Sequence, residues 1–269
     1  MADWTPVNLG THLYAWFNAG AITGLSNGAS VSSWADQSGN SRNLTGVSGK
    51  NPTYATSNLN SLPALVFNGD AGLHGPTSEP DPFDFGSGDF AVTAVAKTDG
   101  NATVIGVVLQ NNSQTDGYAL YRAEVGGAFN FSVALAGTGN AGLDTSTATN
   151  GLLYGFEVIS TSAKGYFDGD HATGTTPDTS VASGTPLQVG YGGSASSINA
   201  NDAFKGSISE IVFHTSNDTN ERQKVEGYLA HKYGLQSGLP SGHPYETNAP
   251  KITPYKGISG GLVDGGLIS

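Results

Sequence analysis

The feature that most constrains this chain is a long series of short β-type runs separated by turn residues. Between residues 62 and 213, runs rich in apolar and β-branched side chains alternate with clusters of Gly, Asn, Asp or Pro. Such spacing is typical of antiparallel sheets joined by tight turns. The sequence therefore predicts an all-β fold, with strands over residues 64–68, 90–98, 103–110, 118–125, 129–135, 153–161, 187–191 and 206–214.

The composition agrees with this fold class. Glycine accounts for 39 of the 269 residues, and charged residues make up only 12% of the chain. This balance suits many short strands and turns better than helices with charged outer faces. A tight hairpin is expected at Asp168-Gly169, because glycine tolerates the positive φ that a two-residue turn requires.

One segment near the C-terminus has the pattern of a helix instead. Asp218 and Glu221 have the spacing of a capping box, in which each side chain accepts from a backbone amide at the helix start. Apolar residues then follow at helical spacing, and Gly234 provides a left-handed stop. We expect an amphipathic helix over residues 219–233 that packs on the sheets.

After this helix the composition shifts to Gly, Pro and Ser. The last segment, residues 246–269, has too few apolar residues to build a core of its own. It is expected to be an extended tail, either disordered or docked onto a partner, and its apolar anchors favour docking. These anchors are Leu262, Val263, Leu267 and Ile268.

The charge balance argues against a nucleic-acid partner. The chain has 11 basic and 22 acidic residues, a formal net charge of -11 that repels a phosphate backbone. It contains no cysteine, so it has neither disulfides nor a thiolate nucleophile. No apolar run long enough to span a membrane is present, and residues 1–18 do not read as a secretory signal peptide.

Four segments, in this order, form a pattern that extends from residue 13 to residue 245. They are residues 13–16 with 28–40, residues 62–69, residues 204–211, and residues 222–245. The succession resembles the concanavalin A-like lectin/glucanase (laminin G-like) family of bacterial surface and phage structural proteins. The resemblance implies a two-sheet antiparallel jelly-roll sandwich over residues 1–245, followed by the tail at 246–269.

That family includes lectins, glucanases, adhesion modules and virion components, so fold alone does not fix the function. We expect a non-enzymatic phage virion accessory protein, such as a capsid decoration, head-fibre or tail-associated protein. It would lie on the virion surface, bind virion proteins through the tail and bind host glycan with the sandwich. The alternatives are a lectin or adhesin module of a bacterial surface, or a glucanase, and a homo-oligomer is left open.

An enzyme is disfavoured because glycoside hydrolysis requires two positioned carboxylates, about 5 to 9.5 Å apart. Glucanases of this family carry them on a Glu-x-Asp-x-x-Glu strand, which this chain lacks. Its nearest acidic cluster, residues 79–84, is broken by prolines and is expected to be a solvated loop. Loss of a β-glucan activity on neutralising Glu157 or Glu210 would reverse this expectation.

A calcium ion is the one cofactor that the sequence suggests. Asp36, Ser38 and Asn40 offer alternating side-chain oxygens in a glycine-containing loop, as a hard cation prefers. The competing interpretation, which we favour, is that Asp36 and Asn40 cap a turn through backbone hydrogen bonds.

Carbohydrate binding requires an aromatic platform next to planar polar groups. Core packing claims most aromatic residues in a sandwich, and Trp16 and Trp34 are expected to be buried anchors. The candidate carbohydrate-binding residues are Tyr118, Tyr121, Tyr166, Tyr191 and Asn112.

Overall fold

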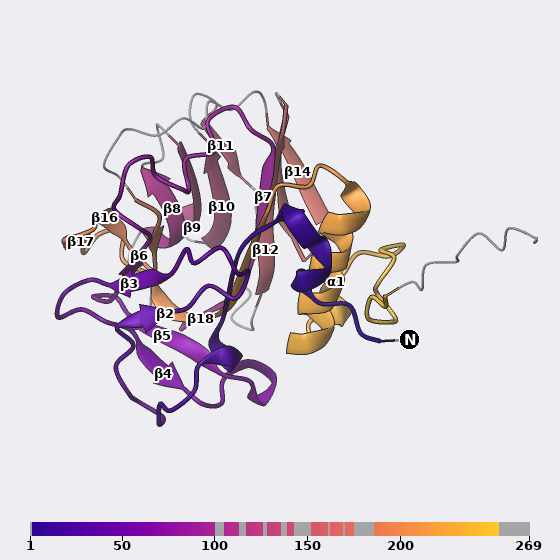
Figure 1. The fold of residues 1–269 in the computed structure, drawn as a ribbon. Helices are drawn as coiled ribbons and strands as arrows, with labels where there is room; N and C mark the ends of the chain where they lie inside the picture. Colours follow the sequence, from indigo (N-terminus) through magenta and orange to yellow (C-terminus); the bar gives the residue numbers. More distant parts are fainter. Residues whose placement is uncertain are drawn as a thin grey trace, which may run out of the picture.

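The structure is a computed structural model, and it describes residues 2–99, 105–112, 117–125, 128–135, 139–142, 152–160, 162–168, 170–174 and 186–252. Within these ranges the chain forms two large antiparallel sheets and one α-helix near the C-terminus (Figure 1). The all-β expectation, with two packed sheets and a C-terminal helix, is confirmed. The tail anchors at residues 262–268 lie outside the described residues.

The first sheet has the strand order β14-β13-β12-β7-β18-β5-β4, and β1 also pairs with β18. Its strands are β1 (Leu13–Asn18), β4 (Thr53–Ala55), β5 (Ala64–Asn68), β7 (Phe90–Thr98), β12 (Leu152–Ile159), β13 (Ser162–Phe167), β14 (Asp170–Gly174) and β18 (Lys205–His214).

The second sheet has the order β11-β10-β9-β8-β15-β6-β3-β2. Its strands are β2 (Ser33–Trp34), β3 (Leu44–Gly46), β6 (Leu73–His74), β8 (Ile105–Asn112), β9 (Gly117–Val125), β10 (Ala128–Leu135), β11 (Gly139–Gly142) and β15 (Gln188–Val189). A separate hairpin joins β16 (Gly192–Ser194) and β17 (Ser197–Asn199).

The main core lies between the two sheets and is built from alternate residues of their strands. In β1 the odd positions are buried and the even positions half-buried, as strand alternation requires. Phe67 and Phe213 of the first sheet and Leu109 and Leu120 of the second belong to one buried cluster. Trp34 is fully buried in this cluster beside Phe17, which confirms it as a core anchor.

The helix α1 (Thr219–Tyr233) has the predicted bounds and ends at Gly234, which adopts a left-handed φ of 71°. The predicted capping box is wrong in its details. Asp218 accepts from the amide of Asn220 and not from that of Glu221. The backbone amide of Asp218 donates to Ser216 Oγ instead, so it is not available to the side chain of Glu221.

Helix α1 packs on β7 and β12 of the first sheet and covers its outer face (Figure 1). A second apolar cluster joins the two layers, with Val225 and Leu229 from the helix and Val95 and Leu153 from the sheet. No helix in the described part of the chain is long and apolar enough to cross a membrane.

The predicted hairpin is present: β13 and β14 pair as antiparallel strands on either side of residues 168 and 169. Asp168 adopts a φ of 45°, as such a turn requires. The predicted strands over residues 64–68 and 90–98 coincide with β5 and β7.

The start of the predicted tail belongs to the folded part of the chain. The amide of Trp4 donates to Pro250 O, and the amide of Ile252 donates to Ala2 O. Lys251 forms an ion pair with Asp3. Residues 250–252 therefore lie along the N-terminal segment, and the part of the tail without described structure begins at residue 253.

Candidate functional site

The four tyrosines predicted to form a carbohydrate platform are buried. Tyr118 and Tyr191 have no exposed surface, and Tyr121 and Tyr166 expose only 2% and 6%. Tyr118 packs between Phe90 and Phe156 in the core. Their ring faces therefore do not provide an exposed stacking surface. The side chain of Asn112 lies outside the described part of the structure.

The Asp36 loop is closed by its own hydrogen bonds. Asp36 Oδ1 accepts from the amides of Trp16 and Ser38, and Oδ2 accepts from Ser38 Oγ and the Arg42 amide. Asn40 Nδ2 donates to the carbonyl oxygens of residues 13 and 14. These contacts use all the acceptor positions of the Asp36 carboxylate, which agrees with the turn interpretation.

A calcium ion in this loop would have to displace some of these donors, and it stays a prediction. Among the residues that the structure describes, no group of three His, Asp or Glu side chains gathers as metal ligands do.

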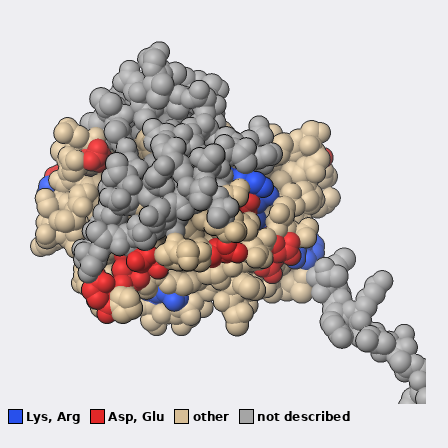
Figure 2. All heavy atoms as spheres, turned by 90° about the horizontal axis from the view of Figure 1, so that it is seen from above, with Lys and Arg blue, Asp and Glu red and all other residues tan. Residues whose placement is uncertain are grey.

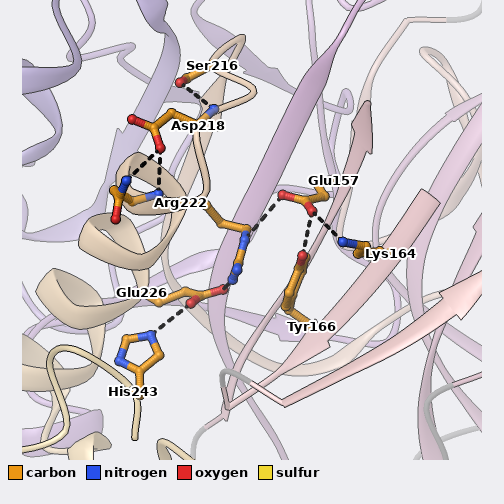
Figure 3. Close-up of polar contacts among 9 residues, drawn as sticks. Glu157, Lys164, Tyr166, Ser216, Asp218, Arg222, Glu226 and His243 are labelled. Atoms are coloured by element: carbon orange, nitrogen blue, oxygen red, sulfur yellow. Dashed lines mark hydrogen bonds and ion pairs between the residues drawn. The ribbon is translucent and has the colours of Figure 1, made fainter. Parts of the chain in front are cut away.

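Buried carboxylates meet helix α1 in two places, the first centred on Arg222 (Figure 3). Arg222 Nε lies 3.2 Å from Glu157 Oε2, and its Nη1 lies 2.5 Å from Glu226 Oε1. Glu157 also accepts a 2.5 Å hydrogen bond from Tyr166 OH, and Glu226 contacts His243 Nε2 at 3.1 Å.

The Arg222 guanidinium lies 3.7 Å above the centre of the Tyr166 ring. Burial and the bond to Glu157 raise the pKa of the Tyr166 hydroxyl, so this group stays a proton donor. Each carboxylate in the network has its partners, and the network joins β12 and β13 to α1 and to the loop that carries His243.

The second place is Glu210, which has no exposed surface. Its Oε1 accepts from Trp16 Nε1 at 2.7 Å and from Tyr228 OH at 3.2 Å. Its Oε2 accepts from Lys232 Nζ at 2.6 Å and from Tyr233 OH at 2.8 Å. Glu157 and Glu210, which sequence analysis singled out as test positions for hydrolysis, thus attach the helix to the first sheet.

A hollow of about 210 Å³ lies where the end of β1 meets β2, next to the Asp36 loop. We call it the rim hollow; it is lined by Asn18, Ala21, Ile22, Thr23, Ser33, Trp34, Ala35 and Gln37. Thr23 and Ser33 are exposed at its mouth, whereas Asn18 and Gln37 are half-buried.

The fully buried indole of Trp34 lines the hollow, and its Nε1 has no hydrogen-bond partner in the described part of the chain. A buried N–H without a partner costs about 1–3 kcal/mol, so a ligand oxygen that reached it would be favoured. Next to it, Gln37 is held in position by its backbone amide, which donates to the carbonyl oxygen of Trp16 at 2.7 Å. The Asp36 loop therefore holds one wall of the rim hollow in place.

A second hollow, of about 190 Å³, lies over β5, β7 and β18. Its lining includes Lys97 and Asp99, together with Asn58 and Ser207. Ser207 Oγ donates to Asn58 Oδ1 at 3.0 Å. The second hollow differs from the rim hollow because charged side chains are part of its lining.

The rim hollow was not predicted from the sequence, although Trp34 and Asp36 belong to the family-like segment over residues 28–40. The pattern showed a buried tryptophan near an acidic loop. It did not show that Asn18 and Thr23, from a separate segment, complete the lining.

No protein-family model and no curated protein sequence matches this chain. Solved structures do match. The fourth domain of an extracellular arabinanase from Geobacillus stearothermophilus, solved with arabinotriose, is 17% identical with a TM-score of 0.51; the match covers 76% of this chain and 93% of that domain. An arabinofuranosidase solved with arabinofuranosyl-xylobiose is 12% identical with a TM-score of 0.58, over 93% of this chain and 68% of the other.

A sialidase of Trypanosoma rangeli, solved with sialic acid, is 13% identical with a TM-score of 0.52. The match covers 81% of this chain but only 33% of the sialidase. The chain shares the β-sandwich fold of these proteins. At such identities the similarity is one of fold.

These matches correct the expectation that the chain is not an enzyme. The matched chains are an arabinofuranosidase, a domain of an arabinanase and, over a third of its length, a sialidase. The absence of the carboxylate strand of one glucanase family is therefore too narrow a ground for excluding catalysis, because this fold also occurs within other glycosidases.

Proposed function

We propose that this chain is a carbohydrate-binding β-sandwich of the concanavalin A-like type, with the rim hollow as its binding site. The observation that carries the proposal is a hollow lined by side-chain amides, hydroxyls and the indole of Trp34, whose buried Nε1 has no hydrogen-bond partner among the described residues. Sites for sugars combine a few placed polar groups with apolar surface, and this lining does so.

The comparisons support the proposal. The arabinanase domain and the arabinofuranosidase were each solved with an arabinose-containing oligosaccharide, and the sialidase with sialic acid. Each of these proteins shares the sandwich fold with this chain over the matched part and was solved with a sugar.

The setting that we propose for this activity is the surface of a phage virion, where the domain would bind host glycan as an accessory protein. Residues 253–269, with the anchors Leu262 and Leu267, would attach it to virion proteins. A lectin or adhesin module of a bacterial surface is the alternative setting, and it requires the same sugar site.

The test is a glycan array probed with the purified full chain, in calcium and in a chelator, with released sugar measured in parallel. We expect selective binding that Gln37→Ala weakens and Lys97→Ala does not, since Lys97 lines the second hollow. Absence of binding to every glycan in both conditions would contradict the proposal.

A further inference from the structure

We infer that the rim hollow takes a single uncharged sugar residue, at the end or on a branch of a glycan, and discriminates against acidic sugars. This inference rests on the proposed carbohydrate binding and adds the class of ligand. It follows from the charge, the size and the hydrogen-bonding groups of the hollow.

The charge of the lining is the first argument. None of the described residues that line the rim hollow is ionisable at neutral pH. The carboxylate of Asp36, next to Ala35 and Gln37, already accepts hydrogen bonds at both oxygens. A sugar carboxylate in the hollow would lose water without gaining a cationic partner, which is strongly unfavourable.

The charge of the whole molecule acts in the same direction. The chain has a formal net charge of -11, and Figure 2 shows Asp and Glu side chains spread in a band across one face. Such a field repels anionic ligands during approach. Neutral glycans are not affected by it.

The size of the hollow limits the ligand to one ring. Its volume is about 210 Å³. Sites that enclose drug-sized ligands are larger, about 300–1,000 Å³. One sugar ring fits this space, and the rest of a glycan would extend outward past Thr23 and Ser33, which are exposed.

The polar groups match the hydroxyls of a sugar. Asn18 Oδ1 accepts from the Gly20 amide, which leaves its NH₂ group to donate to a ligand. Gln37 Nε2 donates to Ala35 O, which leaves its Oε1 to accept. With the hydroxyls of Thr23 and Ser33, the hollow presents donors and acceptors to sugar hydroxyls, which can serve as either.

Apolar surface completes the lining. Ile22 is half-buried, and Ala21 and Ala35 add small side chains. The C–H groups of a sugar ring require such a surface, because they bury apolar area.

The experiment measures binding of methyl α-L-arabinofuranoside, methyl β-D-xyloside, methyl β-D-galactoside and N-acetylneuraminic acid by saturation-transfer NMR with the full chain. We expect at least one neutral glycoside to bind, and N-acetylneuraminic acid to bind at least about tenfold more weakly. Thr23→Val and Gln37→Ala should each weaken binding by about fivefold or more. Lys97→Ala should have no effect.

Trp34→Phe removes the Nε1 donor and keeps an aromatic ring, and circular dichroism reports whether this variant folds. If Trp34→Phe does not fold, Thr23→Val and Gln37→Ala still test the site, because Thr23 is exposed and Gln37 is half-buried. Equal binding of N-acetylneuraminic acid would overturn the neutral specificity, and binding unaffected by Thr23→Val and Gln37→Ala would overturn the site. In both cases a positive glycan array would leave carbohydrate binding by the sandwich standing, although the second result would move its site away from the rim hollow. A silent array would contradict carbohydrate binding itself.

Discussion

At the scale of single residues, the most informative groups are those whose surroundings move their pKa. Burial raises the pKa of Asp168 to about 6, although its Oδ1 accepts the Leu153 amide at 3.0 Å. Burial lowers the pKa of His214 to about 4. The two groups give opposite pH dependences of stability.

Asp168→Asn is expected to stabilise the protein at neutral pH. Between pH 3.8, the ordinary pKa of an aspartate, and about pH 6, the folded protein retains a proton that the unfolded chain has released. The stability of the wild type therefore falls as pH rises through this range. Asparagine keeps the acceptor for Leu153 and tolerates the positive φ. We expect a gain of about 1 kcal/mol at pH 7.5 by urea unfolding, and a smaller gain at pH 4.5; equal gains at the two pH values would contradict this account.

His214 contributes in the other direction. Its folded-state pKa lies below the ordinary value of 6.5, so its contribution to stability is present above that value and is lost as pH falls towards 4. In Asp168→Asn the contribution of Asp168, which increases stability as pH falls, is absent. The free energy of unfolding of this variant should therefore fall more steeply with acidification than that of the wild type.

At the scale of elements, the sequence predicted strands and a helix well but their neighbours poorly. The bounds of β5, β7 and α1 follow from local residue patterns and turn signals. The strand pairing does not follow from local patterns. In the first sheet Ala91 pairs with Glu157 on one side and with His214 on the other, and these three residues are far apart in the sequence. The networks under α1 depend on this register, and so they were not predicted.

Arg222→Ala tests the attachment of the helix to the sheet. It would leave the buried Glu157 and Glu226 without their shared cation, and we expect stability to fall by about 3–5 kcal/mol. The matched control is Lys224→Ala, half-buried on the same helix and outside this network, with a change within about 0.5 kcal/mol. Similar losses in the two variants, measured by urea unfolding, would show that the network does not anchor the helix.

The Asp36 loop has its own test. Asp36→Ala leaves the amides of Trp16, Ser38 and Arg42 without their acceptor, and we expect a loss of about 1–3 kcal/mol. If the loop is a hydrogen-bonded turn, the loss is the same in calcium and in chelator. A wild-type melting temperature that rises with calcium, and an Asp36→Ala melting temperature that does not, would instead establish a metal site.

At the scale of the whole molecule, one side of the sandwich is fixed by the helix and the open edge carries the rim hollow. The fold class was predictable because turn spacing and strand patterns are local. The hollow was not, since its lining joins the end of β1 to β2 through tertiary packing. The tyrosine platform was wrong for the same reason, because the sandwich buries those rings.

The chain beyond residue 252 provides a prediction at this scale. Deleting residues 253–269 leaves every described contact in place, so we expect the melting temperature to stay within about 1 °C while attachment to a virion is lost. Deleting residues 246–269 also removes Pro250 and Lys251, which contact Trp4 and Asp3, and should lower the melting temperature by several degrees. Equal melting temperatures for the two deletions would contradict the packing of residues 250–252.

The central claim is that a sugar binds in the rim hollow, and the indole N–H of Trp34, a residue that lines the hollow, reports on that binding. The chain has three tryptophans, so its ¹⁵N NMR spectrum should contain three indole resonances, and Trp34→Phe or Trp16→Phe assigns them. With the glycan selected by the array at saturation, we expect the Trp34 resonance to shift and those of Trp4 and Trp16 to stay in place. Saturating binding that leaves the Trp34 resonance unmoved would contradict the account.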